Sequence, residues 1–500
     1  MSSARPTTIQ PAEGPLELRV RRLDELHDPE RAFAHLFGDS PNAFWLDSSS
    51  SVDERARFSF IGDSGGPLGA VIAYDVGTGE VRVERGGEVE ILRESIFDYL
   101  GRESRRLRRS PGNLPFDFDC GFVGYFGYEL KADCEGEAAH DAPTPDAAFV
   151  FADRLIAFDH LERRTYILCA TELDGAEKGE RWIGETKRRL AALPPLPDPE
   201  HAGTLADGEL VDFHLRHSHE RYLDDIATCK QRLFEGDTYE VCLTNKVIAE
   251  CAPDPLRLYR NLRRVNPAPF AALLRFGDVA VLSSSPERFL SVDRDHWAEA
   301  RPIKGTRHRG DTPAGDARLA EGLRADEKSR AENVTIVDLL RNDLGIVCEY
   351  GTVHAPQLME VETYETVHQL VSTVRGRLRE DVEPPDCIRA CFPPGSMTGA
   401  PKRRTMEILD ELEGEARGVY SGAIGYLGLG GGCDLSVAIR TIVIDGETAT
   451  IGAGGAIVLD SNPGEELEEM LLKARAPMRA IDPSADALTA FERALEASRG

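Results

Sequence analysis

The order of apolar and polar positions predicts strands and helices in a mixed sequence along the chain. Apolar or alternating runs predict strands at residues 69–74, 148–153, 165–169, 270–276, 279–283, 438–444 and 449–453. Apolar positions at helical spacing predict helices at residues 180–193, 220–235 and 331–343. Because the strands come in blocks with helices between them and no regular strand–helix alternation, the pattern favours an α+β fold with complex α/β layers.

One internal segment interrupts this pattern. Residues 191–208, AALPPLPDPEHAGTLADG, are dense in proline, glycine and acidic residues, a composition typical of a subdomain boundary or a long surface loop. We therefore expect an N-terminal subdomain at residues 18–195 and a C-terminal domain at residues 215–480. The first seventeen or so residues and the tail after about residue 480 are expected to be poorly ordered ends.

Composition indicates a globular protein and narrows the choice of partners. Of 500 residues, 41% are hydrophobic and 29% are charged, which is enough to bury a large core. With 59 basic and 86 acidic residues, the net charge is −27. Such a charge repels nucleic acid and anionic membranes, so neither is an expected partner. An anionic ligand would need a local positive site.

Targeting and cysteine signals are weak. The N-terminal residues 1–16 show no signal-peptide pattern, and no apolar run approaches the roughly 18 residues of a membrane-spanning helix. We therefore expect a cytoplasmic protein. The ten cysteines include no CxxC pair, and the closest two are Cys387 and Cys391, so the expected state is reduced structural thiols without zinc or disulfides.

The first candidate for chemistry is Lys304, which lies in RPIKGT at residues 301–306. An isolated lysine in this setting is usually a solvated surface group. However, Glu287 lies 17 positions earlier, in SSPERF after an apolar strand. Neighbouring strands can bring both side chains into one cavity, where burial is expected to raise the pKa of the acid and lower that of the lysine. Such a pair suits proton donation and nucleophilic attack.

A second candidate group lies on two predicted helices. Residues 460–463, DSNP, predict a helix start with Asn462 as the N-cap and proline in the first turn. On that helix Glu466, Glu469 and Lys473 fall at i, i+3 and i+7, on one face. Glu332 lies near the start of the helix at 331–343. Such carboxylates are usually solvated, but if the helices converge they make an oxygen-rich site suited to magnesium.

A third group offers donors for an anion. GSMTGAPK at residues 395–402 precedes a helical pattern at 403–413, so its backbone amides are candidates for binding a carboxylate. GAGG at residues 452–455 reads as a second flexible turn. Arg440 interrupts an apolar strand, where a buried arginine needs an anionic partner. Each glycine segment alone is more often a plain loop.

Together these segments resemble the family of chorismate-utilising enzymes. The matching blocks run in order from about residue 236 to 473: GDTYEVCL, SSPERFL, RPIKGT, AENVTIVDLLRNDLG, VETYETVHQLVSTV, CFPPGSMTGAPKRRTMEILDELE, RGVYSGAIGYL, AIRTIV and EELEEMLLKA. Weaker similarity appears earlier, in FWLDS, RFSFIG and GFVGYFGYE. The resemblance implies the fold of that family, with two intertwined subdomains of antiparallel sheets flanked by helices.

Two positions distinguish reactions within this family. Members that activate water carry a lysine where this sequence has Glu240, so water addition is not expected. Members that aminate ring carbon 2, such as anthranilate synthase component I, have PIAGT where this chain reads PIKGT. Lys304 therefore implies amination of chorismate at ring carbon 4, giving 4-amino-4-deoxychorismate. Amination at carbon 2, by an anthranilate or aminodeoxyisochorismate synthase, is the alternative, and a non-catalytic binding subunit is a remote one.

The resemblance also implies roles for single residues. In the catalytic group, Lys304 would attack ring carbon 2 and Glu287 would protonate the 4-hydroxyl. His368 would be oriented near the ring. The substrate-binding group would be Arg440, Tyr420, Gly454, Gly455, Lys473, Ser396 and Thr398. Magnesium would be held by Glu332 and Glu469, with Glu466 nearby. Ser329 replaces an acidic residue of several relatives and receives no role.

A partner that supplies ammonia is expected besides chorismate, and tryptophan is a further candidate ligand. None of the ten cysteines lies in a GxCxG-like elbow, so ammonia would come from a separate glutamine amidotransferase subunit. In relatives the N-terminal subdomain can hold tryptophan, and Asp47, Ser48 and residues 57–59 resemble the edges of that pocket.

Overall fold

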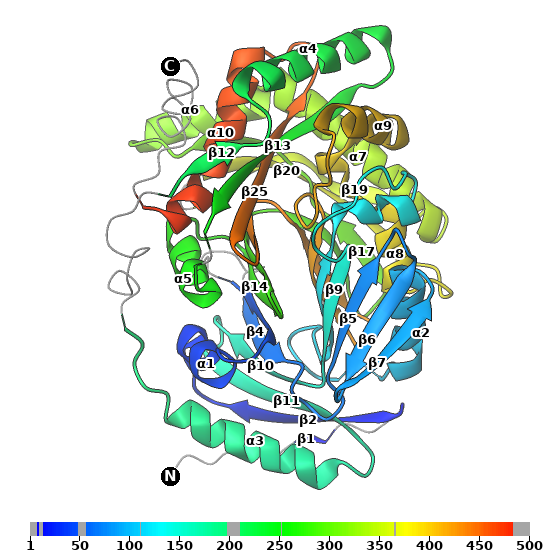
Figure 1. The fold of residues 1–500 in the computed structure, drawn as a ribbon, viewed down its shortest axis with the longest axis vertical. Helices are drawn as coiled ribbons and strands as arrows, with labels where there is room; N and C mark the ends of the chain where they lie inside the picture. Colours follow the sequence, from blue (N-terminus) through cyan, green and yellow to red (C-terminus); the bar gives the residue numbers. More distant parts are fainter. Residues whose placement is uncertain are drawn as a thin grey trace.

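The computed structural model describes residues 8–9, 14–48, 57–110, 112–197, 211–251, 253–364 and 367–483. These residues form two large antiparallel sheets flanked by helices (Figure 1). Helices α1 (Pro29–Leu36), α5 (Pro255–Val265) and α10 (Pro463–Ile481) line one side of the molecule, and α2 (Ile96–Leu107) and α8 (Pro384–Cys391) line the opposite side. The predicted α+β layers are confirmed.

The first sheet has 13 described strands. Its order is β1 (Thr8–Ile9), β2 (Leu16–Leu23), β11 (Arg164–Glu172), β10 (Arg154–Asp159), β4 (Phe58–Asp63), β3 (Asn42–Asp47), β14 (Phe270–Phe276), β15 (Val279–Ser285), β24 (Thr441–Asp445), β25 (Thr448–Ile457), β13 (Glu240–Glu250) and β12 (Phe213–Leu215), and β21 (Gly399–Ala400) pairs with β13.

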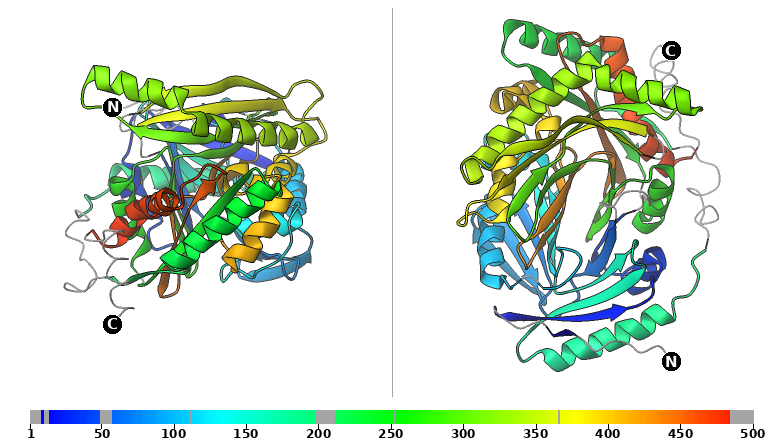
Figure 2. Two further views of the ribbon diagram at one scale, coloured as in Figure 1. Left: turned by 90° about the horizontal axis from the view of Figure 1, so that it is seen from above. Right: turned by 180° about the vertical axis from the view of Figure 1, so that it is seen from behind.

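The second sheet has 12 described strands. Its order is β18 (Ile303–His308), β20 (Val367–Arg377), β17 (Trp297–Ala300), β16 (Arg288–Val292), β23 (Cys433–Val437), β22 (Ala423–Gly428), β8 (Gly121–Phe126), β9 (Ala147–Ala152), β5 (Ala70–Asp75), β6 (Glu80–Arg85) and β7 (Glu88–Arg93), and β19 (His354–Thr363) pairs with β20. Figure 2 shows α6 (Pro313–Ala325) and α7 (Glu327–Val347) lying across β18 and β20.

Each sheet contains strands from both halves of the chain. The N-terminal strand β3 pairs with β14 in the first sheet, and β8 pairs with β22 in the second. Residues 18–195 and 215–480 therefore do not build separate sheets but share both of them. The predicted intertwining is confirmed, and every site near the middle of a sheet draws residues from distant parts of the sequence.

Two apolar clusters hold these layers together. One cluster includes side chains of both sheets, and the rings of Phe60 on β4 and Tyr426 on β22 lie 5.9 Å apart between centroids. The other lies between the first sheet and its helices, where Phe33 of α1 stacks on Trp45 of β3 at 5.6 Å. Strand β13 faces this second cluster with Val241 and Leu243, so alternation turns its other side chains to the opposite face.

Helix starts follow the capping signals of the sequence. α10 begins as predicted, with the Asn462 side chain accepting hydrogen bonds from the amides of Gly464 and Glu465. α7 begins at Glu327, four positions before its predicted start, because Asp326 caps it by accepting from the Ser329 amide. Helices α3 (Ala176–Ala191), α4 (His219–Glu235) and α9 (Lys402–Glu413) lie close to their predicted ranges.

Three local predictions need correction. Residues 452–455, predicted as a turn, lie inside β25 and pair with β13. Arg440, predicted inside a strand, lies just before β24 with a positive φ of 53°. Residues 8–9 and 16–23 form β1 and β2, although the first seventeen residues were expected to be poorly ordered.

The predicted boundary at residues 191–208 falls mostly outside the described residues, which stop at 197 and resume at 211. The tail after residue 483 also lies outside them, so the structure does not test its predicted disorder. Within the described ranges, no helix is both long and apolar enough to cross a membrane.

Gly124, at the centre of β8, offers a test of this architecture. A Cβ atom there would lie 1.9 Å from the Ala148 carbonyl oxygen, because β8 is pressed between β9 and β22. We expect Gly124→Ala to lower the free energy of unfolding by about 2–3 kcal/mol. Gly184→Ala in α3, where a Cβ meets nothing within 4 Å, should raise it by about 0.5–1 kcal/mol. Urea unfolding midpoints that rank the two variants the other way would contradict this packing.

Candidate active site

Lys304 and Glu240 form a buried ion pair between the two sheets. Lys304 lies on β18 of the second sheet and Glu240 opens β13 of the first. The Lys304 Nζ lies 2.5 Å from the Glu240 Oε1, and the two residues are 8% and 1% exposed. The other oxygen, Glu240 Oε2, has no hydrogen-bond partner among the described residues. Because a buried charge requires a partner, this pair joins the two sheets at a polar centre.

The pKa of Lys304 differs from the prediction. Burial lowers it, but the carboxylates of Glu240 and Glu332 outweigh burial, so the net direction is upward. The predicted lowering of the Lys304 pKa is therefore wrong. Its cause was invisible in the sequence, because Glu240 lies 64 positions away along the chain. Lys304 rests in its protonated form.

Glu287 follows the prediction for the acid. It lies between β15 and β16 and is 8% exposed. Burial raises the pKa of Glu287 to about 7, against the opposing effects of a hydrogen bond from Ser396 and the charge of Lys304. The expected rise is confirmed, so the side chain keeps its proton up to about neutral pH. Since Lys304 acts on Glu287 electrostatically, both groups lie in the same buried region.

The loop at 395–402 contributes one of its two predicted side chains to this region. Ser396 reaches Glu287, as described above. The Thr398 hydroxyl instead donates to the carbonyl oxygens of Pro394 and Gly395, at 3.4 and 3.3 Å. Thr398 therefore serves the internal hydrogen bonding of the loop.

Arg417, which received no role from the sequence, holds this loop against β13. Its guanidinium is buried and makes two 2.7 Å contacts with the Glu413 carboxylate. It also donates to the carbonyl oxygens of Met397 and Cys242, at 2.7 and 2.9 Å. Five donors in a rigid fork suit this task. The sequence signal was present, because Arg417 opens the matched block RGVYSGAIGYL, but it did not reveal these partners.

The predicted face of α10 lies against the glycines of β25. A Cβ built on Gly455 would lie 3.4 Å from Glu466 Oε2, 3.8 Å from Glu469 Oε1 and 3.8 Å from Lys473 Nζ. The three α10 side chains therefore converge on one point, as their spacing predicted. A side chain larger than that of alanine at position 455 would enter the space between them.

The carboxylates here are of the chemical type that magnesium prefers, but they do not form a closed cluster. In the described ranges no group of three His, Cys, Asp or Glu side chains is close enough to hold a metal by itself. Instead, the Lys328 Nζ lies between two of them, 2.8 Å from Glu466 Oε1 and 3.9 Å from Glu332 Oε1. Glu466 Oε2 is buried and has no partner among the described residues. Hard carboxylate oxygens with one unpartnered atom suit magnesium.

Two cationic groups lie beside this face of α10. The Lys473 Nζ contacts Glu469 Oε1 at 2.7 Å and donates to the Gly454 carbonyl oxygen at 2.8 Å. Arg440 donates to the Lys473 carbonyl oxygen at 3.1 Å, and burial lowers its pKa. These are the two cations that the resemblance assigned to the carboxylates of a substrate, and both lie close to the carboxylate face of α10.

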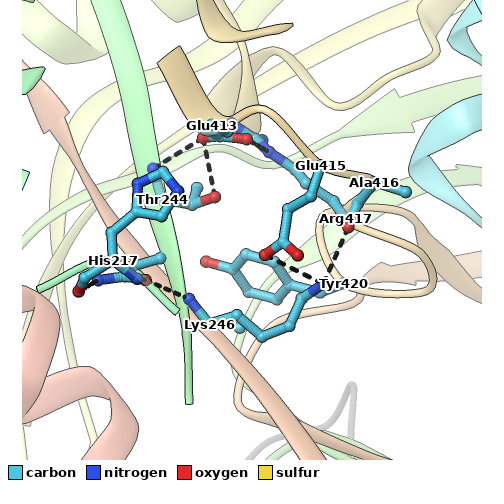
Figure 3. A pocket seen from close by; sticks show the side chains of 10 residues that line it. His217, Thr244, Lys246, Glu413, Glu415, Ala416, Arg417 and Tyr420 are labelled. Carbon is cyan, nitrogen blue, oxygen red and sulfur yellow. Dashed lines mark hydrogen bonds and ion pairs between the residues drawn. The ribbon is translucent and has the colours of Figure 1, made fainter. Parts of the chain in front are cut away.

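Tyr420 lines a pocket beside residues 244–246, in the middle of β13. Figure 3 shows its ring inside the pocket, beside Lys246 and near the Glu413 carboxylate. A Cβ on Gly452 would fall 2.1 Å from the ring, so glycine is required there. Because strand alternation places Lys246 on the same face as Glu240, the pocket and the Lys304 centre lie along one strand face.

His368 is held by its own network. Its Nε2 lies 2.8 Å from Asp316 Oδ1 on α6, and its Nδ1 lies 2.9 Å from Thr363 Oγ1 on β19. Within the described residues its hydrogen bonds join it to neither Lys304 nor Glu287. Its predicted orienting role near the ring stays a prediction.

The region resembling a tryptophan pocket is tightly hydrogen-bonded. Asp47 is 3% exposed, and its carboxylate accepts hydrogen bonds from Ser59, Tyr259 and Arg263 at 3.1, 3.3 and 2.9 Å. Residues 49–56 lie outside the described ranges. Tryptophan binding there stays a prediction.

Comparisons with known proteins agree with this arrangement. The family model for chorismate binding enzymes matches residues 77–479. An aminodeoxychorismate synthase of Streptomyces pristinaespiralis is 50% identical over 97% of this chain and 68% of its own length. Another, of Streptomyces griseus, is 48% identical over 94% of this chain and 65% of its own length. The chain thus spans about two thirds of these relatives. The crystal structure of anthranilate synthase component I from Streptococcus pneumoniae aligns with a TM-score of 0.72 and 29% identity, covering 85% of this chain and 92% of that one.

The burial of Glu287 predicts a pH dependence of stability. Its folded pKa of about 7 exceeds the ordinary value of 4.5, so the folded state holds this proton more tightly than the unfolded state. Its contribution to stability is therefore complete below pH 4.5 and is lost as the pH rises through 7. We expect Glu287→Gln to reduce the loss of unfolding free energy between pH 5 and pH 8 by about 2–3 kcal/mol.

The measurement is urea unfolding of the wild type and the variant at both pH values in EDTA. Glu185→Gln, which removes an exposed carboxylate on α3, serves as the matched control and should leave the pH dependence unchanged. Parallel pH profiles for the wild type and Glu287→Gln would show that Glu287 titrates normally.

Proposed function

Because this chain belongs to the chorismate binding enzyme family, we propose that it aminates chorismate at ring carbon 4 to give 4-amino-4-deoxychorismate. The observation that carries the proposal is the buried Lys304, paired with Glu240 and close to the protonated Glu287. Similarity to two relatives named aminodeoxychorismate synthase, over nearly the whole of this chain, supports the same reaction.

Covalent catalysis divides the substitution into two steps, an attack by Lys304 and an attack by ammonia. The neutral Lys304 amine attacks ring carbon 2, the ring double bonds shift, and the 4-hydroxyl leaves as water with the proton of Glu287. Ammonia then adds at carbon 4 and returns one proton to Glu287, the double bonds shift back, and the bond between Lys304 and carbon 2 breaks. The net change replaces hydroxyl by amine at one carbon. An alanine in place of Lys304 offers no such route.

Glu240 supplies the step that makes Lys304 nucleophilic. Lys304 rests protonated, since its carboxylate neighbours raise its pKa, and an ammonium group has no lone pair for attack. Glu240 Oε1, at 2.5 Å, is positioned to accept this proton. The proton transfer leaves both groups neutral. A buried site holds two neutral groups at a lower cost in desolvation than two charges.

Charged groups around this centre suit the two carboxylates of chorismate. Arg440 and Lys473 provide cations, and Gly455 leaves β25 without a side chain in front of α10, while the Gly454 carbonyl oxygen accepts a hydrogen bond from Lys473. A bound magnesium ion would be held by Glu332, Glu466 and Glu469 and would neutralise a substrate carboxylate. Ser396 holds Glu287 by a hydrogen bond.

A partner glutamine amidotransferase is the proposed source of ammonia. Glutamine hydrolysis requires an activated cysteine thiolate. All ten cysteines lie in the described ranges, and nine of them are buried. Burial raises the thiol pKa in examples such as Cys120, Cys229 and Cys433. These thiols are packing groups and lack the environment of a nucleophile.

Product identification with Lys304→Ala tests the central step. Incubation with chorismate, magnesium and an ammonium salt should give 4-amino-4-deoxychorismate, detected by liquid chromatography and mass spectrometry. We expect Lys304→Ala to lower its rate of formation by at least about 10³-fold, because the nucleophile is gone. Arg307→Ala, which changes an exposed cation on the same strand, should retain the rate. Anthranilate formed by the wild type would move amination to carbon 2 and favour the alternative function.

The nitrogen source tests the proposed partner separately. The purified chain should turn over chorismate with ammonium salts and show negligible turnover with glutamine, because nine of its ten cysteines are buried. The assay measures glutamate release beside product formation. Robust glutamate release by the chain alone would contradict the need for a second subunit.

A further inference from the structure

Lys328 occupies an unusual place for a cation. It lies in the first turn of α7, where the positive end of the helix dipole disfavours a positive side chain. Nevertheless, its Nζ reaches 2.8 Å from Glu466 Oε1 on α10 and 3.9 Å from Glu332 Oε1 on its own helix. The two carboxylates therefore hold an ammonium group at the point where α7 and α10 meet.

No other cation balances Glu466. Glu466 is 2% exposed, and Lys328 is the one cationic side chain of the described ranges within ion-pair distance of it. Lys473, the nearest alternative on α10, is paired with Glu469. A buried carboxylate without a counter-charge is strongly destabilising. Lys328 is therefore needed to balance Glu466 as long as no other cation occupies the space between Glu332 and Glu466.

We propose that Lys328 is an internal cation that competes with magnesium for the space between Glu332 and Glu466, and thereby sets the magnesium affinity of the site. This inference rests on the magnesium assignment of the proposed function. Magnesium binds carboxylate oxygens at about 2.0–2.1 Å, so its ion and the Lys328 ammonium cannot share the same oxygens. Two positive charges that close also repel each other.

The Lys328 side chain can leave the space between the two carboxylates. Lys328 is 43% exposed, and its flexible four-carbon stem allows the ammonium to swing into solvent. A divalent ion then gains one more charge of attraction than the ammonium it replaces, whereas a monovalent ion gains none. Lys328 therefore lowers the apparent affinity of the site for every cation by the same factor, because binding requires the fraction of molecules in which Lys328 has moved.

The test is magnesium binding to the full chain carrying Lys328→Met, which keeps the length of the side chain and removes its charge. Isothermal titration of MgCl₂ into EDTA-treated, desalted protein should give a dissociation constant about tenfold lower than that of the wild type. Lys328→Arg, which keeps the charge, should bind no more tightly than the wild type. Arg330→Met removes an exposed cation two positions away on α7 and should leave the affinity unchanged.

Thermal unfolding gives a second readout that needs no activity. In EDTA, Lys328→Met should unfold at a lower temperature than the wild type, because Glu466 loses its counter-charge. Magnesium should then raise the unfolding temperature of the variant by more than it raises that of the wild type. Lys328→Gln provides a smaller neutral side chain for the same measurements if the methionine variant folds poorly.

The outcomes separate this inference from the proposed function. Equal or weaker magnesium binding by both neutral variants, in a chain whose product formation still requires magnesium, would overturn the role of Lys328 and leave the proposed function standing. Absence of magnesium binding to every variant, with product still formed in EDTA, would overturn the magnesium assignment and the role of Lys328 together. Tighter magnesium binding by Lys328→Met and Lys328→Gln, but not by Lys328→Arg or Arg330→Met, supports the inference.

Discussion

The ion pair between Lys304 and Glu240 is the constraint on which the site depends. Each residue comes from a different sheet, so the pair forms only when both sheets are complete. Each sheet in turn needs strands from both halves of the chain, through the pairings of β3 with β14 and β8 with β22. The intertwined topology is therefore what brings a buried amine and a buried carboxylate together.

Glu287 differs from Glu240 in its relation to the lysine. Burial raises the pKa of Glu287 to about 7, and the hydrogen bond from Ser396 and the charge of Lys304 lower it only in part. Glu240 instead makes the hydrogen bond to Lys304 and raises the pKa of the lysine. One dry environment thus treats its two acids differently, because only Glu240 is hydrogen-bonded to Lys304.

Local sequence patterns predicted the parts of the site that lie within single elements. The face of α10 with Glu466, Glu469 and Lys473 follows from helical spacing and the Asn462 cap, so it was predictable. The partners of Lys304 and Lys328 lie 64 and 138 positions away, and no local pattern encodes such distances. The raised pKa of Lys304, the strand at 452–455 and the role of Arg417 were missed for the same reason, because each depends on β13 and its neighbours in the sheet.

A strongly acidic protein can bind a dicarboxylate because its carboxylates are already paired within the site. Glu240 holds Lys304, Glu466 holds Lys328 and Glu469 holds Lys473. Each lysine is thus kept at a defined position by a carboxylate. The Glu240–Lys304 pair is desolvated during folding, whereas Lys328 and Glu469 stay partly exposed. The net charge of −27 describes the protein as a whole, whereas the local charge of the site depends on how its individual lysines are paired.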